Sequence, residues 1–124
     1  MMKQNLPCPA NGFPVLDLVL LGMGADGHTA SLFPDTDILH CRDKSVDAVY
    51  VKKMQSWRLS MTLPVLDNAR HIMILVAGAD KADVIGQVFS EAGTESNFPI
   101  QMIQATGELE WYLDEAAAQH ILKG

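Results

Sequence analysis

The sequence is poor in positive charge, and its cations form no cluster. It has 9 Lys and Arg against 15 Asp and Glu, so the formal net charge is −6. Proteins bind nucleic acids chiefly through the phosphates, and this requires a basic patch. The scattered cations of this chain therefore argue against a nucleic-acid partner.

Long hydrophobic runs and paired cysteines are also lacking. The longest apolar run, Ile72–Ala79, is far shorter than the ~20 residues that span a bilayer. Asp17 interrupts the apolar region at Val15–Leu21, and no small-residue cleavage site follows it, so a signal peptide is not indicated. Two lone thiols, Cys8 and Cys41, favour reduced cysteines in such a chain. The sequence predicts a soluble, cytoplasmic protein with no membrane partner.

What is present is an ordinary globular composition. Apolar residues make up 48% and charged residues 19% of the 124 residues, which is typical of a folded domain. At roughly 150 residues per domain, the chain is one domain or part of one. Residues 1–14 contain Pro7, Pro9 and Pro14 and show no period, so we interpret them as an irregular lead-in to a single α/β unit over residues 15–124.

Hydrophobic patterns predict strands that alternate with helices. Val15–Leu21 and His71–Ala77 are almost continuously apolar, which is typical of parallel strands covered by helices on both faces. The other expected strands are Ala48–Lys52, Trp57–Thr62, Met102–Ala105 and Leu109–Leu113. The expected helical segments are His28–Phe33, Leu63–Ala69, Asp80–Ala92 with Gly93 as its cap, and Asp114–Leu122. This order predicts an α/β fold with a partial doubly wound, mainly parallel sheet.

A glycine-rich segment follows the first predicted strand at the spacing of a dinucleotide-binding fingerprint. Its glycines are Gly22, Gly24 and Gly27. The fingerprint needs a full helix after its third glycine, whereas Pro34 arrives soon afterwards. Asp26 would also place a negative charge where the phosphates bind. We therefore predict no nucleotide cofactor here.

The alternative interpretation is a ligand-binding turn that carries Asp26 and His28. Ligands of open α/β sheets bind at the carboxyl ends of the strands, where this turn lies. Glycine lets the backbone approach a ligand closely, and His is suited to proton transfer near neutral pH. A purely structural turn, with His28 as a cap or filler, stays open on the residues alone.

Two cations are candidates for binding an anion. Lys81 follows the strand at His71–Ala77 and would emerge at the same sheet edge as His28 if the two strands are parallel, near a helix N-terminus. Arg58 shares a strand face with Ser60 and Thr62, opposite Trp57, Leu59 and Met61. A bidentate phosphate contact or an ordinary solvated surface would explain either cation.

Other chemistry has less support in the sequence. His40, His71 and His120 show no metal-ligand spacing, so no metal site is predicted. Ser31 lies in no nucleophile-elbow context, which gives a serine hydrolase mechanism no support.

The segment Leu16–Pro34, which reads LDLVLLGMGADGHTASLFP, is similar to the signature of the 6-phosphogluconolactonases, relatives of the glucosamine-6-phosphate isomerases. Three further stretches agree with that family in order: Arg58–Pro64, Val76–Ala82 and Leu109–Ala117. The resemblance covers almost all of the chain, but only about the C-terminal half of the family's length. The family's N-terminal half, with its phosphate loop and a further substrate-contacting arginine, has no counterpart here.

The resemblance implies an enzyme of the pentose phosphate pathway that hydrolyses 6-phosphoglucono-1,5-lactone without a metal or cofactor. The family's catalytic histidine falls on His28, and its phosphate-binding arginine and lysine fall on Arg58 and Lys81. The glycine turn would supply backbone N–H groups to the substrate, with Asp26 orienting the turn or His28.

A glucosamine-6-phosphate deaminase is disfavoured because deaminases carry an acidic residue five positions after this histidine, where Phe33 stands. A non-catalytic sugar-phosphate-binding module is the other alternative. Without the family's N-terminal half, an apolar strand edge would be exposed, so we expect self-association and weak or absent activity from the chain by itself.

Overall fold

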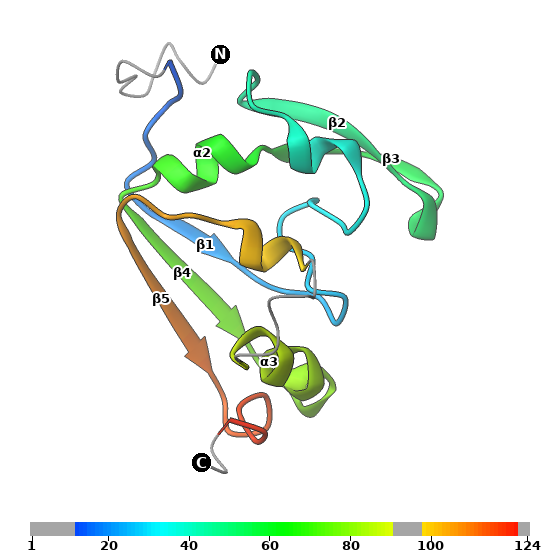
Figure 1. Ribbon diagram of the computed structural model, residues 1–124, viewed down its shortest axis with the longest axis vertical. Helices are drawn as coiled ribbons and strands as arrows, with labels where there is room; N and C mark the ends of the chain where they lie inside the picture. Colours follow the sequence, from blue (N-terminus) through cyan, green and yellow to red (C-terminus); the bar gives the residue numbers. More distant parts are fainter. Residues whose placement is uncertain (1–11, 91–97, 122–124) are drawn as a thin grey trace.

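The computed structural model describes residues 12–90 and 98–121, which form two small sheets and a few short helices (Figure 1). The larger sheet contains β1 (Val19–Leu21), β4 (His71–Val76) and β5 (Glu108–Leu113) in the order β1-β4-β5. Both strand pairs are parallel. The predicted α/β class with a mainly parallel sheet is therefore confirmed. No helix in these ranges is long and apolar enough to cross a membrane.

One face of the parallel sheet is packed, and no described helix covers the other, which we call the bare face. Helices α2 (Leu63–Asn68) and α3 (Ala82–Val88) share one apolar cluster with the inward side chains of the strands. Figure 1 shows α2 above β1 and α3 beside the end of β4, with no described helix or strand to the left of β5. On the bare face, Leu20 is 59% exposed, and Leu75 and Tyr112 are exposed as well.

The expectation of helices on both faces of the sheet is therefore wrong for the residues that the structure describes. The apolar run at β1 is almost continuous, yet alternate positions have different surroundings: Val19 and Leu21 are buried, whereas Leu20 faces out. Both α-helices of the described residues pack in the cluster on the inner face. A parallel sheet normally has both faces covered, so the bare face is an unfilled packing surface.

The second sheet is an antiparallel hairpin of β2 (Val46–Val51) and β3 (Ser56–Met61), joined by η2 (Lys52–Met54). The alternation predicted for β3 is present, but the polar side chains face inward. Ser60 and Thr62 are buried, whereas Trp57 and Leu59 are 70% and 75% exposed. The interpretation of that polar face as a solvated surface is wrong here because both hydroxyls form internal hydrogen bonds. Ser60 Oγ accepts from the Ser31 amide at 3.1 Å, and Thr62 Oγ1 donates to the Lys44 carbonyl at 2.6 Å.

Several predicted boundaries change. The strand at Met102–Ala105 is wrong, because Pro99 begins a 3₁₀ turn, η5 (Pro99–Met102). The Gln104 amide then bonds to the Asp67 carboxylate at 2.8 Å rather than to a strand. The helix expected at Asp80–Ala92 is η3 (Ala79–Lys81) followed by α3, and Gly93 lies outside the described residues.

Two other helical predictions are replaced by turns. Within His28–Phe33 the chain forms a tight turn, in which the Leu32 amide bonds to the Thr29 carbonyl at 2.9 Å and Ala30 has φ 52°. The described part of Asp114–Leu122 also consists of turns. A further short 3₁₀ element, η1 (Asp37–His40), lies in the expected polar loop after Pro34.

The bare face and the outer edge of β1 predict concentration-dependent self-association. Exposed apolar surface and an unpaired strand edge both favour pairing with another chain. We expect the sedimentation coefficient of the isolated chain to rise with concentration and Leu20→Lys to suppress that rise. Leu59→Lys, which changes an even more exposed leucine on the hairpin, should leave it unchanged. An effect of Leu59→Lys alone would place the contact on the hairpin, and an equal effect of both substitutions would show that the sheet face is not the specific contact.

Candidate functional site

The glycine segment forms a closed turn immediately after β1. The Gly24 amide donates to the His28 carbonyl at 2.9 Å, and the Gly27 amide donates to the Gly24 carbonyl at 3.0 Å. Thr29 Oγ1 donates to the Gly22 carbonyl at 2.8 Å and fastens the turn to the strand end. The turn therefore returns His28 to the carboxyl end of β1, as the sequence predicted. Turns rather than a helix follow Gly27, in agreement with the rejection of a nucleotide fingerprint.

Two of the three glycines have a specific steric reason to be glycine. A Cβ on Gly24 would lie 2.1 Å from His28 Cε1 and 2.2 Å from its Nδ1, well inside contact distance. Gly27 has φ 79°, a left-handed conformation that side chains disfavour, and its Cβ would meet the Phe98 ring at 2.5 Å. A Cβ on Gly22, by contrast, would have no neighbouring atom within 4 Å. The turn thus needs Gly24 to make room for the His28 ring.

Asp26 and His28 form a close pair. His28 Nδ1 lies 2.5 Å from Asp26 Oδ1, and the His28 amide donates to the same oxygen at 3.1 Å. The other oxygen, Asp26 Oδ2, lies 3.3 Å from Lys53 Nζ. Partial burial raises the pKa of Asp26, but the hydrogen bonds from His28 and Lys53 outweigh burial and hold the pKa below its ordinary value. Asp26 is therefore a carboxylate at neutral pH.

This arrangement sets the orientation of the imidazole. A carboxylate at Nδ1 favours the tautomer with a proton on that nitrogen, which leaves Nε2 as a proton acceptor. The ring of His28 also stacks on Phe33, with centroids 4.2 Å apart and planes 18° apart. The hydrogen bond and the stacking together hold His28 in the state that a general base requires.

Lys81 lies beside His28 at the carboxyl end of the sheet, as we predicted from the parallel direction of the two strands. Its Nζ donates to the Met23 carbonyl at 2.7 Å. Lys81 and His28 line one cavity of about 440 Å³ together with the glycine turn. The remaining lining residues are Gly22, Met23, Gly24, Thr29 and Ala30. An ammonium group has three donors, so Lys81 supports the turn and keeps donors for an anion.

Arg58 is not brought to that cavity. It is exposed on β3, and its Nη2 lies 3.4 Å from Met54 Sδ. Its strand neighbour on the same face, Ser60, does contact the turn region through the Ser31 amide. Ser60 therefore contacts the segment that follows the glycine turn, but the Arg58 guanidinium lies outside the lining of the cavity.

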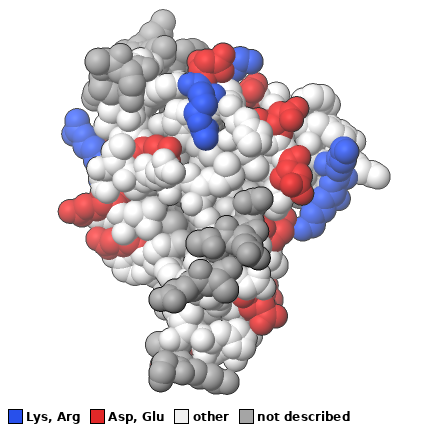
Figure 2. All heavy atoms as spheres, viewed as in Figure 1, with Lys and Arg blue, Asp and Glu red and all other residues white. Residues whose placement is uncertain are grey.

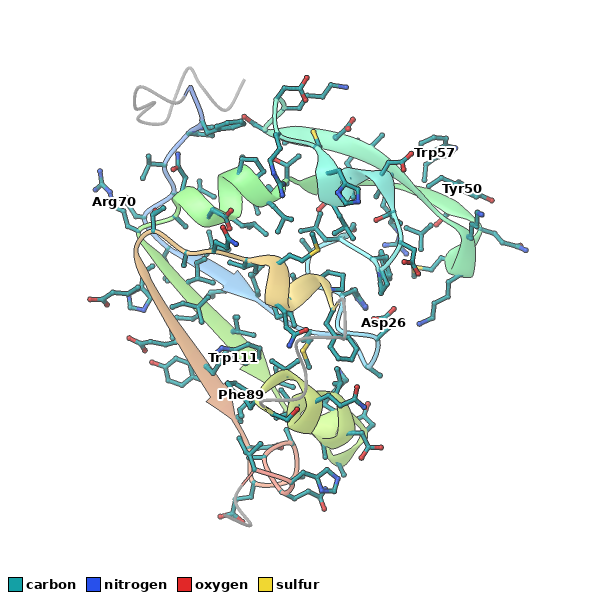
Figure 3. All side chains as sticks on the ribbon, viewed as in Figure 1. Asp26, Tyr50, Trp57, Arg70, Phe89 and Trp111 are labelled. Atoms are coloured by element: carbon teal, nitrogen blue, oxygen red, sulfur yellow. The ribbon has the colours of Figure 1, made fainter. Side chains whose placement is uncertain are left out.

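A second and larger cavity, of about 880 Å³, adjoins the pair from the hairpin side. Its lining includes Asp26, Lys52, Lys53 and Trp57, together with Phe33, but not His28. Figure 3 shows Asp26 on the turn and Trp57 out on the hairpin. Asp26 therefore lies between the two cavities, with His28 on one side and Lys53 on the other. Of these two cavities, only the smaller one is lined by His28 and Lys81.

Two groups of charged side chains were not predicted from the sequence, because residues distant in the sequence meet only in the folded structure. Lys53 meets Asp26 across the fold. His71, Glu108 and Glu110 also meet, with one ligand atom from each lying within 4.8 Å of the others. Their strands begin at the end of the sheet opposite the glycine turn, so this group takes no part in the site. Charges are otherwise mixed on the face in Figure 2, with Lys and Arg interspersed among Asp and Glu.

Comparisons with known proteins agree with this geometry. Residues 1–111 match the model of the family described as glucosamine-6-phosphate isomerases/6-phosphogluconolactonase. This chain belongs to that family. The resemblance that the sequence motifs indicated is thereby confirmed.

Among family members, a 6-phosphogluconolactonase of Synechocystis is 43% identical over 112 residues, covering 90% of this chain and 46% of the relative. The human 6-phosphogluconolactonase is 41% identical over 111 residues, covering 88% of this chain and 43% of the relative. The crystal structure of 6-phosphogluconolactonase from Leishmania guyanensis superposes with a TM-score of 0.84 at 32% identity, covering 97% of this chain and 49% of that one. The chain thus spans about half the length of the relatives it matches.

Proposed function

We propose that this chain carries the catalytic turn of a 6-phosphogluconolactonase, which hydrolyses 6-phosphoglucono-1,5-lactone to 6-phosphogluconate. The observation that carries the proposal is the His28–Asp26 pair at the end of β1, beside a cavity that both His28 and Lys81 line. The family match and the names of the relatives support the same reaction.

The proposed mechanism is acyl transfer to water. His28 Nε2 removes a proton from water as the water oxygen bonds to the lactone carbonyl carbon. The resulting imidazolium, stabilised by the Asp26 carboxylate, then protonates the ring oxygen as the C–O bond breaks. This transfer regenerates the neutral imidazole, and the new carboxylic acid then releases one proton to solvent to give the carboxylate of 6-phosphogluconate. This series of steps requires neither a metal nor a cofactor.

The glycine turn is proposed to bind the lactone through its backbone. The amides of Gly24 and Gly27 already donate inside the turn, so stabilisation of the carbonyl oxygen falls to the other amides of the segment. Gly22 and Gly24 line the cavity and admit the substrate close to the main chain. Asp26 acts on His28 rather than on the substrate.

Lys81 is proposed to bind the phosphate, and Arg58 to join it once the substrate is present. We expect Lys81→Met to raise KM by roughly 10- to 100-fold, corresponding to about 1–3 kcal/mol of lost charge-assisted contact, with a smaller change in kcat. Steady-state kinetics on the phosphorylated and unphosphorylated lactones measure the changes in KM and kcat. Equal losses on both lactones would instead assign Lys81 to support of the turn through Met23.

The experiment that tests the proposed function compares this chain with a form extended by a family-like N-terminal half. Proton release from the lactone, followed in a pH-stat above the uncatalysed rate, reports turnover. We expect strong activity in the extended form and little in the isolated chain, because the described residues provide only part of a substrate-binding surface. An isolated chain that turns over as fast as the extended form would show that the rest of the relatives' length is dispensable.

The alternative enzymatic function is that of a glucosamine-6-phosphate deaminase. Phe33 stacks on His28 in the position where deaminases carry an acid, and a phenyl ring cannot relay a proton. No ammonia release from glucosamine 6-phosphate is therefore expected. A non-catalytic sugar-phosphate module would bind 6-phosphogluconate but leave the lactone at its uncatalysed rate.

A further inference from the structure

The tip of the β2–β3 hairpin contacts the catalytic turn through a single charged side chain among the described residues. Lys53 belongs to η2, the short 3₁₀ element between the two strands. Its Nζ lies 3.3 Å from Asp26 Oδ2, while Asp26 Oδ1 faces His28 Nδ1 at 2.5 Å. The carboxylate is therefore held from both sides, by the hairpin at one oxygen and by the imidazole at the other.

We propose that Lys53 is a positioning residue that holds the Asp26 carboxylate in the orientation that aligns His28. The inference deepens the proposed function, since it treats His28 as the base of the same reaction. Lys53 acts through Asp26 and does not touch the reacting atoms.

The physical reason is the freedom of a carboxylate that is bound at one oxygen only. Asp26 can rotate about its side-chain bonds, and the imidazole would rotate with it. An ammonium at the second oxygen fixes the carboxylate plane and favours its charged form. Because the side chain of Lys53 is 71% exposed, the pair adds little to folding stability. Orientation has a larger effect on catalysis, where small misplacements of a catalytic group lower the rate.

Lys53 is the one lysine or arginine among the described residues that forms an ion pair with Asp26. His28 from the turn and Lys53 from the hairpin contact the carboxylate directly. The remaining charged residues on the adjoining cavity are Asp35, Asp37, Asp47 and Lys52. Three of these four are acidic, so removal of Lys53 leaves no directly bound cation other than a protonated His28 among the described residues.

The chain offers a matched control. Lys52 is the neighbour of Lys53 in η2, is also exposed, and has no ion pair with a described residue. Lys52→Met and Lys53→Met remove the same charge from the same element. Lys53→Arg keeps the charge and is the conservative variant.

The test combines two measurements. In the isolated chain, ¹³C NMR titration of the Asp26 carboxyl and ¹⁵N shifts of the His28 ring report the pair without any turnover. In the extended form, kcat and its pH profile report catalysis. We expect Lys53→Met to raise the pKa of Asp26, to reduce the population of the Nδ1-protonated tautomer and to lower kcat about two- to five-fold. The acid limb of the pH profile should move to higher pH, since Asp26 would be protonated earlier.

Lys52→Met should change none of these quantities, and Lys53→Arg should restore them. Equal effects of Lys52→Met and Lys53→Met, or no change in the His28 ring shifts in Lys53→Met, would overturn the proposal. Failure of the lactonase reaction itself would appear separately. The unmodified extended form would then show no turnover, while Lys53→Met would still change the Asp26 titration and the His28 ring shifts.

Discussion

His28→Asn is expected to lower kcat of the extended enzyme by about 10²–10⁴-fold, the usual contribution of a positioned general base. Asn keeps a polar group near Asp26 but cannot accept and return a proton at the Nε2 position. KM should change far less, because Lys81 and the glycine turn remain in place. The measurement is initial-rate hydrolysis of the lactone above its spontaneous rate.

The control for His28→Asn is binding of the product. If the variant still binds 6-phosphogluconate in calorimetry while turnover is lost, the imidazole acts in the chemical step. Full turnover in His28→Asn would remove His28 from the mechanism and leave the turn as a binding element only. Loss of both binding and turnover would indicate that the turn itself had collapsed.

Gly24→Ala is expected to reduce kcat by about 10²-fold although it adds only one methyl group. That methyl would lie 2.1 Å from His28 Cε1, and the imidazole is the part that can move. His28 must then rotate out of its hydrogen bond with Asp26, and a displaced catalytic group lowers the rate steeply. The melting temperature should fall much less than the rate, because the clash is relieved by a side chain rather than by the backbone.

Gly22→Ala is the matched substitution for Gly24→Ala. A Cβ at Gly22 meets nothing within 4 Å, so the ¹⁵N shifts of the His28 ring should stay at their original values. In Gly24→Ala those shifts should move toward those of a free imidazole. Unchanged shifts in Gly24→Ala would mean that the turn backbone adjusts instead, and the steric argument would then be wrong.

Sequence patterns predicted the parts of the fold that depend on short-range regularity. The apolar run at β4 and the alternation at β3 indicated strands, and the helix predicted at Leu63–Ala69 is present as α2. The errors arose where backbone groups find distant partners. Gln104, for example, bonds to Asp67, so its segment is no strand. The inward direction of Ser60 was also unpredictable, because the partner of its hydroxyl, Ser31, lies in another element.

In the candidate site, too, residues close in the sequence were predicted, whereas a contact between distant residues was not. The glycine spacing with Asp26 and His28 is local, so the sequence identified the turn and its candidate catalytic pair. The strand order correctly placed Lys81 beside them. Lys53 was missed because only the fold of the hairpin brings it to Asp26. The role of Arg58 stays a prediction, since its guanidinium lies outside the cavity lining.

The parallel pairing of β1 with β4 has a consequence for synthesis of the protein on the ribosome. The paired residues Val19 and Ile72 are 72 − 19 = 53 positions apart. At about 5–20 residues per second, β1 therefore waits roughly 3–11 s for the only partner strand it has in the described chain. Contacts between such distant positions also form slowly during folding. During that interval the apolar side chains of β1 have no paired strand among the described residues, so they stay accessible to chaperones for seconds.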